Sequence, residues 1–224
     1  MNSVIKRLLF GLLDPVVFGL ILFGTAGTLN YWQAWVFLAA SSLSTWIPGI
    51  YLLRTNPEAL ERRTRGGPTA ETRPVQKVII VGWYLSLASA IVLSAVDHRF
   101  GWSTVPTAIC LVGDVLVVVG LSVVMLVVIQ NSYAATTVQV EADQKLASTG
   151  LYGLVRHPMY TGNVIMMVGI PLALGSYWGL AFVIPGVIVL GLRIRDEEAL
   201  LRKELEGYRS YTQKVRYRLV PLMW

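Results

Sequence analysis

Arg156, His157 and Tyr160 are the residues whose types and spacing best suit chemistry, because they gather where a polar loop enters an apolar stretch. A helix that begins at Pro158 would keep them within about one turn of each other, since proline suits the first helical turn. The free N–H groups of that turn favour an anion. The cluster therefore predicts a receptor for a carboxylate or a phosphate. Taken singly, Arg156 is explained as a membrane-edge anchor and Tyr160 as an interfacial aromatic.

A second charged cluster lies at 193–198, at the end of a later apolar stretch. Glu198 and Arg202 are four residues apart, a helical ion pair that explains one of the two adjacent carboxylates. Glu197 has no such obvious partner, and a carboxylate can accept hydrogen bonds from a ribose diol or neutralise an ammonium group. Arg193, one turn earlier, could hold an anionic substrate group at the membrane surface.

Membrane helices are the elements that must position these clusters. The 224-residue chain is 54% hydrophobic and 14% charged, with a mean hydropathy of +0.59, whereas a soluble domain carries about 25% charged residues. The charges are concentrated between long apolar runs, which indicates an all-α integral membrane protein. Six apolar segments can be marked, at 8–29, 33–53, 77–96, 105–129, 158–175 and 177–193.

The first four segments are long enough to cross about 30 Å of hydrocarbon, and the last two would form a hairpin around Gly175 and Ser176. With six passes and a cytoplasmic N-terminus, 18 of the 19 basic residues lie inside and only Arg99 lies outside. The positive-inside rule selects this orientation, with both termini and the site at the cytoplasmic face. The net charge of +6 is then explained by basic loops beside anionic lipid, without a nucleic acid partner.

Two regions are predicted along the chain. Residues 1–129 would hold four membrane helices with a basic loop at 54–77, and residues 130–224 would hold the chemical core. The tail at 199–224 carries Leu200, Leu201, Leu205 and Tyr208 at helical spacing, which predicts an amphipathic helix that helps to form the site. Its alternative is a helix that lies on the membrane surface.

Other polar residues carry weaker signals. No metal site is expected, because His98 and His157 fall on opposite sides of the membrane in this topology. Cys110 is the single cysteine and lies in an apolar run, which predicts a buried structural thiol rather than a disulfide. Asp114 is a further functional candidate, since a charge inside an apolar segment is costly.

The residues quoted above resemble the isoprenylcysteine carboxyl methyltransferase family, whose relatives include the membrane phospholipid N-methyltransferases. The resemblance spans roughly residues 130–221, including Asn131, Gln139 and the pair Tyr208 and Tyr211. It depends on the Arg-His-Pro-x-Tyr-x-Gly element at 156–162 together with the distant Glu-Glu pair at 197–198. The first hundred residues match only as generic membrane helices.

The resemblance implies a methyltransferase that uses S-adenosylmethionine and transfers its methyl group to a lipophilic acceptor entering from the bilayer. It implies that Arg193 faces the reacting group of the acceptor and that Arg156 helps to hold the site. The cofactor-binding residues that it implies are Gln139, Leu146, Tyr152, Arg156, His157, Pro158, Tyr160, Glu197 and Glu198.

An isoprenylcysteine-like carboxylate is the expected acceptor, and a phospholipid amine or a small thiol are the alternatives. The run Gly113-Asp114-Val115 lacks the second glycine of the element that phospholipid N-methyltransferases share. Gly207 is followed directly by Tyr208, whereas the prenylcysteine enzymes space them further apart. A sterol-type reductase with a nicotinamide cofactor, and a small transporter or structural membrane protein, are the competing functions.

Overall fold

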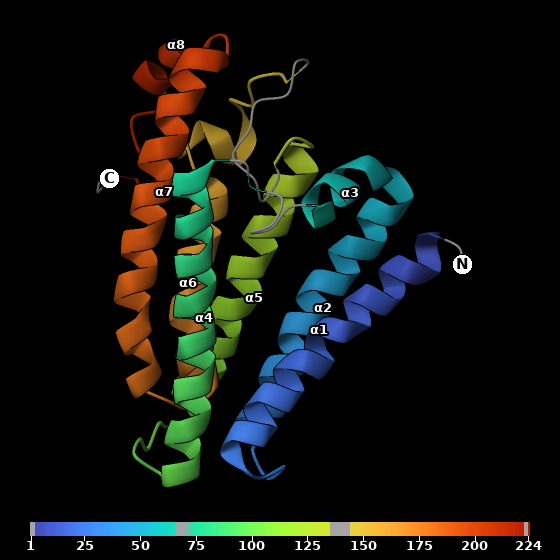
Figure 1. The fold of residues 1–224 in the computed structure, drawn as a ribbon, viewed down its shortest axis with the longest axis vertical. Coiled ribbons are helices and arrows are strands. Elements are labelled where there is room, and N and C mark those ends of the chain that lie inside the picture. Colours follow the sequence, from blue (N-terminus) through green and yellow to red (C-terminus); the bar gives the residue numbers. More distant parts are fainter. Residues whose placement is uncertain (1–2, 66–70, 72, 135–143, 222–223) are drawn as a thin grey trace.

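The computed structural model describes residues 3–65, 71, 73–134, 144–221 and 224. Every regular element in this part of the chain is a helix, which confirms the all-α prediction (Figure 1). The α-helices are α1 (Ser3–Ala26), α2 (Trp32–Thr55), α3 (Pro57–Arg65), α4 (Pro74–Phe100), α5 (Thr107–Gln130), α6 (Pro158–Ala173), α7 (Val183–Glu204) and α8 (Tyr208–Lys214). Two short 3-10 helices, η1 (Gly150–Gly153) and η2 (Trp178–Phe182), precede α6 and α7.

Four helical stretches are long and apolar enough to cross a membrane, namely Trp32–Thr55, Pro74–Phe100, Thr107–Gln130 and Trp178–Glu204. The shorter apolar helices Leu13–Ala26 and Pro158–Ala173 lie beside them. Large apolar side chains on the outside, such as Val78 and Leu20, are 74% and 70% exposed, as expected where hydrocarbon replaces water. The chain is therefore an integral membrane protein.

The segments that carry most of the lysine and arginine residues lie at one end of the bundle. The N-terminus of α1, helix α3, the start of α4 and helix α8 lie at this end, which we call the site end (Figure 1). Arg99 lies in the last turn of α4 at the opposite end. This arrangement agrees with the charge distribution on which the cytoplasmic orientation was predicted, and the orientation itself stays a prediction.

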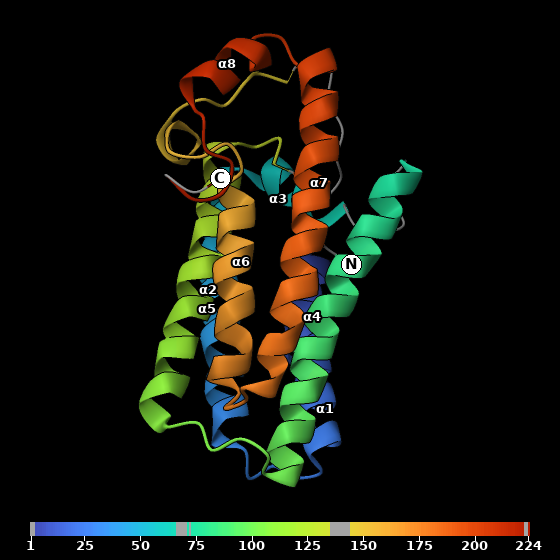
Figure 2. The same ribbon diagram turned by 90° about the vertical axis from the view of Figure 1, so that its left-hand side faces the viewer.

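The hairpin of α6 and α7 lies beside α4 and α5 and turns near their lower ends in Figure 2. Ser176, in its turn, donates a hydrogen bond of 2.5 Å to Asp97 in the last turn of α4. The backbone N–H and the hydroxyl of Ser103 also donate to Asp97, each at 2.7 Å. Asp97 thus ties the hairpin turn to the last turn of α4.

Glycines set the close approach of α5 to α6. A Cβ atom on Gly120 would lie 2.6 Å from the carbonyl oxygen of Gly162, and one on Gly169 would lie 2.8 Å from that of Gly113. Such distances leave no room for a side chain, so the two backbones pack directly against each other. This contact fixes α6, whose first turn carries the polar cluster.

The end of the chain differs from the prediction. Residues 199–204 do not start a separate amphipathic tail helix, because α7 continues without a break to Glu204. The helix ends at Leu205, which is extended, and Gly207 follows in the left-handed region with φ of 79°. A positive φ is available to glycine at little cost, so the chain turns here and only the seven residues Tyr208–Lys214 form α8. Cys110 is fully buried, as predicted.

Candidate active site at one end of the bundle

The Arg-His-Pro element is held between α6 and the C-terminal segment. Pro158 is the first residue of α6, which confirms the predicted helix start. The backbone N–H groups of Arg156 and His157 donate to the carbonyl oxygens of Tyr217 and Arg218, each at 2.9 Å. The hydroxyl of Thr161 donates to the carbonyl of Leu219 at 2.7 Å. The segment that follows α8 therefore fixes the backbone of the element.

The first turn of α6 offers fewer free donors than the sequence suggested. Pro158 has no N–H, and the N–H groups of Tyr160 and Thr161 both point to the carbonyl of His157, at 3.0 and 3.1 Å. Side chains, rather than the helix terminus, must therefore supply most of the polar contacts at this site.

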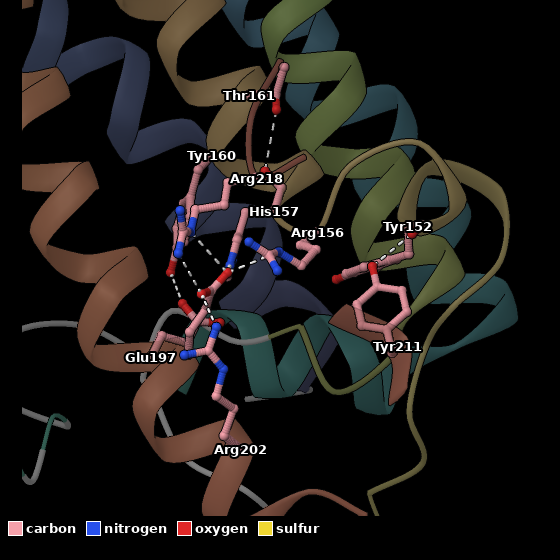
Figure 3. A network of polar contacts seen from close by, with 10 residues as sticks. Tyr152, Arg156, His157, Tyr160, Thr161, Glu197, Arg202, Tyr211 and Arg218 are labelled. Atoms are coloured by element: carbon pink, nitrogen blue, oxygen red, sulfur yellow. Dashed lines mark hydrogen bonds and ion pairs between the residues drawn. The ribbon is translucent and has the colours of Figure 1, made fainter. Parts of the chain in front are cut away.

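Glu198 lies at the centre of a group of cationic side chains and is only 1% exposed. Its Oε1 lies 3.0 Å from Nε of Arg156 and 3.3 Å from Nε2 of His157. Its Oε2 lies 3.1 Å from Arg202 and 3.2 Å from Arg218. Figure 3 shows these four side chains converging from three separate segments. The helical pair of Glu198 and Arg202 is confirmed, and three guanidinium groups around one carboxylate leave an excess of positive charge.

Glu197 has a different environment from its neighbour. Its Oε2 accepts a hydrogen bond of 2.5 Å from the phenol of Tyr160, a partner that the sequence did not reveal. The same phenol accepts a bond of 2.8 Å from Nε of Arg193, and its ring stacks on the imidazole of His157 with centroids 5.5 Å apart. Tyr160 thus connects the two charged clusters of the sequence, one on α6 and one on α7.

A cavity opens between these side chains and the loop before α6. Of the residues predicted to bind a cofactor, it is lined by Leu146, Tyr152, Arg156, His157, Pro158, Tyr160 and Glu197. Glu198 and Arg193 do not line it, being 1% and 6% exposed, and each contacts a side chain that does. Gln139 lies outside the described residues. The role of each residue in cofactor binding stays a prediction.

Several residues of the cavity were missed as site residues. The apolar and aromatic side chains of Leu201, Leu205, Tyr208 and Tyr211 form one wall. Their helical spacing was the available signal, but it predicts one buried face without showing what that face covers. The turn at Gly207 changes the direction of the chain before α8, and residues on both sides of this turn line the cavity.

Hydrogen bonds link Tyr152 to Tyr211 and Asn131, all three of which line the cavity. The phenol of Tyr211 donates a bond of 2.7 Å to the carbonyl of Tyr152, and Asn131 donates one of 3.1 Å to the phenol of Tyr152. Burial is the main cause that raises the pKa of Tyr208 and of Tyr211 above its ordinary value. Both phenols therefore remain neutral hydrogen-bonding groups at physiological pH.

Asp114 is not part of this site. It lies in α5, is 6% exposed, and neither of its carboxyl oxygens has a hydrogen-bond partner among the described residues. It does not line the cavity described above.

The site region is similar to a known protein family. Residues 108–206, which carry both polar clusters, match the family model described as phospholipid methyltransferase. Over these residues the chain is similar to that family. This phospholipid methyltransferase stretch covers α5 from its second residue, all of α6 and α7, the Arg-His-Pro element and the Glu-Glu pair. The predicted resemblance is confirmed at this level.

Two curated relatives match part of the chain. A Delta(14)-sterol reductase from Mus musculus is 30% identical over 95 residues, which is 39% of this chain and 22% of that protein. A probable 7-dehydrocholesterol reductase from Acanthamoeba polyphaga mimivirus is 32% identical over 80 residues, 34% of this chain and 18% of that protein. The chain thus spans about a fifth of the length of these relatives.

A solved structure of a eukaryotic intramembrane Ras methyltransferase, isoprenylcysteine carboxyl methyltransferase, is similar over 99% of this chain and 87% of its own. The TM-score is 0.46 and the sequence identity is 15%.

Proposed function

We propose that this chain is a membrane methyltransferase that uses S-adenosylmethionine to methylate a lipophilic acceptor. The observation that carries the proposal is the cavity that joins Arg156, His157, Tyr160 and Glu197 inside the phospholipid methyltransferase stretch. The residues that line the cavity belong to the start of α6, the end of α7, α8 and the loop before α6, which lie at the site end of the bundle. A polar cofactor can reach the cavity from water there, while an apolar acceptor stays in the bilayer.

The side chains of the cavity fit the parts of this cofactor. Glu197 uses one oxygen for Tyr160 and lines the cavity, so its remaining lone pairs suit a ribose diol or an ammonium group. Arg156 and His157 belong to a group with an excess of positive charge, which suits a carboxylate. Tyr152, Leu201 and their apolar neighbours provide a surface for an aromatic base.

Arg193 is the residue that we assign to the acceptor. It is 6% exposed, lies at the level of Tyr160 and is held by the phenol of that residue. A guanidinium can orient a carboxylate through two parallel hydrogen bonds. We therefore propose an isoprenylcysteine-like carboxylate as the acceptor, and a phospholipid amine or a thiol as the alternatives to screen.

Positioning does most of the work in such a reaction. When bound, S-adenosylmethionine supplies a methyl group on a carbon activated by the sulfonium. Tyr160 connects Glu197, on the cofactor side, with Arg193, on the acceptor side, and so keeps the two binding groups at a fixed spacing. A carboxylate acceptor arrives without a proton to lose and needs no general base, whereas an amine would need one.

A sterol reductase is the second candidate, because both curated relatives are named as reductases of sterols. We expect such an enzyme to use a nicotinamide cofactor. Glu197 in the cavity wall suits the cationic ammonium group of S-adenosylmethionine, which a reduced nicotinamide dinucleotide lacks. This charge favours the methyltransferase.

Calorimetry on the purified protein in detergent tests the proposal. S-adenosylmethionine and reduced nicotinamide adenine dinucleotide phosphate are titrated in parallel. We expect wild-type protein to bind only the first. Glu197→Gln and His157→Ala should each weaken binding about tenfold or more, since a hydrogen bond to a charged group contributes about 1.5–3 kcal/mol.

Glu206→Gln, an exposed glutamate in the turn before α8, is the matched control and should bind like wild type. Binding of the nicotinamide alone would replace the proposal by the reductase. Unchanged binding by both site variants would refute the residues assigned here. Transfer of labelled methyl groups to prenylated thioether acids, amine lipids and thiols then identifies the acceptor.

A further inference from the structure

Gln76 is a fully buried amide in the first turn of α4, 0% exposed, and it lies outside the phospholipid methyltransferase stretch. A buried amide is stable only when its polar atoms are hydrogen-bonded. The side chain of Gln76 accepts a bond of 3.1 Å from Nη1 of Arg193 and donates one of 2.5 Å to Asp196. It therefore joins α4 to two charged residues of α7, the helix beside it (Figure 2).

Asp196 determines which way the amide faces. Its Oδ1 is held by Arg73, at the N-cap of α4, at 2.7 Å. An ionised carboxylate can only accept hydrogen bonds, so Gln76 must present its NH2 group to Asp196 and its oxygen to Arg193. The pair of Arg73 and Asp196 is partly exposed, 32% and 21%, and adds little stability by itself. Its effect is to fix the orientation of the Gln76 amide, with the NH2 group toward Asp196 and the oxygen toward Arg193.

Arg193 is consequently held on two edges of its guanidinium. Nε donates to the phenol of Tyr160 at 2.8 Å and Nη1 donates to Gln76. Because the guanidinium is planar and rigid, two fixed edges define the direction of the whole group. Neither Gln76 nor Asp196 lines the cavity, so their influence on a reaction would pass through Arg193.

We propose that Gln76 and Asp196 are positioning residues that orient Arg193 toward the methyl acceptor. The inference rests on the proposed function, which assigns Arg193 to the acceptor. It adds α4 to the active site, although the two charged clusters of the sequence lie far along the chain from α4. Methyl transfer depends on near-linear alignment of the reacting atoms, so a guanidinium that rotates lowers the rate without changing cofactor binding.

The test compares turnover with cofactor affinity in purified protein with labelled S-adenosylmethionine and the acceptor found in the screen. For Gln76→Leu we expect kcat to fall about tenfold to a hundredfold, while the Kd for the cofactor stays at the wild-type value. Ser94→Ala is the control, because Ser94 is equally buried in α4 but lies near its opposite end. Ser94→Ala should keep the wild-type kcat and the wild-type Kd for the cofactor.

Exchanging the hydrogen-bond donor and acceptor between Gln76 and Asp196 tests the orientation of the amide directly. Gln76→Glu keeps an acceptor for Arg193 but sets a second carboxylate against Asp196, so kcat should fall. Adding Asp196→Asn restores a donor to that position, and the double variant should regain much of the lost kcat. The inference would be overturned if the double variant were no faster than Gln76→Glu. It would also be overturned if Gln76→Leu kept the wild-type kcat, or if Gln76→Leu lost cofactor affinity in parallel with kcat.

A measurement that needs no turnover separates this inference from the proposed function. The Nε–H signal of Arg193 in protein labelled with 15N-arginine can be assigned through its loss in Arg193→Lys. In Gln76→Leu the signal should move and exchange faster with water, and an unchanged signal contradicts the positioning role. Wild-type protein without cofactor binding would instead refute the proposed function, and this signal would still decide the positioning.

Discussion

Glu198 and Glu197 are adjacent in sequence and have opposite surroundings. Glu198 points into the protein, where four side chains offset the cost of burying its charge. Glu197 lines the cavity and holds the phenol of Tyr160. The α-helix turns by about 100° per residue, so neighbours on α7 face different sides. The structure therefore favours a structural role for Glu198, whereas Glu197 is placed to meet a ligand.

Replacing Glu198 should show this structural role. In Glu198→Gln the buried group no longer neutralises Arg156 and its cationic neighbours. Removing one partner of a buried ion pair costs about 3–5 kcal/mol, so the thermal unfolding midpoint in detergent should fall clearly. Tryptophan fluorescence during heating measures it. Glu204→Gln, an exposed position on the same helix, should melt like wild type, and equal midpoints for both variants would disprove the role.

At the scale of elements, the contact of α5 with α6 decides where the Arg-His-Pro element stands. Gly120 and Gly162 approach so closely that neither tolerates a side chain. The other end of α6 is fixed through Leu174, whose carbonyl accepts a bond of 2.6 Å from the phenol of Tyr31. Helix α6 is thus held at both ends, and its position determines where His157 and Tyr160 lie.

Gly120→Ala should force α5 and α6 apart. Its Cβ would lie 2.6 Å from backbone oxygen, and overpacking of this kind costs about 1–3 kcal/mol. We expect a lower unfolding midpoint together with weaker cofactor binding in calorimetry.

Gly49→Ala, in α2, is the matched substitution, because a Cβ there meets nothing within 4 Å. Alanine gains about 1 kcal/mol of helix propensity over glycine, so this variant should be as stable as wild type or more so. If Gly120→Ala and Gly49→Ala changed the unfolding midpoint equally, the close contact of α5 with α6 would not be the reason why Gly120 excludes a side chain.

For the whole molecule, the C-terminal segment closes the site that the membrane helices leave open at their end. Segments near residues 152, 156–161 and 198 all bond to residues after Gly207. Arg218 contributes both a backbone carbonyl to His157 and a guanidinium to Glu198. The site is thus assembled from the loop before α6, from α6 and α7, and from the last residues of the chain (Figure 3).

Tyr211→Phe should loosen this closure. The variant loses the bond to the carbonyl of Tyr152, worth about 0.5–1.5 kcal/mol, and the Kd for the cofactor should rise about twofold to tenfold. Limited proteolysis should also cut the segment after α8 more quickly. Tyr51→Phe, an exposed tyrosine of α2, is the control. Wild-type affinity and proteolysis in Tyr211→Phe would show that closure does not depend on this bond.

The sequence by itself determined the helical class, the helix start at Pro158 and the gathering of charge at one end. Those features depend on local rules, since hydrophobic length marks a membrane helix and proline marks its first turn. The cluster at Arg156, His157 and Tyr160 could be foreseen because its members are local in sequence, whereas its hydrogen bond to Glu197 could not. The resemblance that named these residues is confirmed at the level of the family over 108–206.

Only the tertiary structure decided which partner each charge takes. Glu198 meets Arg218, and Arg193 meets Gln76, across 20 and 117 residues of chain, and no spacing rule links residues that far apart. The direction of α8 after the end of α7 likewise depended on one turn, at Gly207. The physical reason is that helix formation follows from neighbours in sequence, whereas the pairing of buried polar groups follows from helix packing.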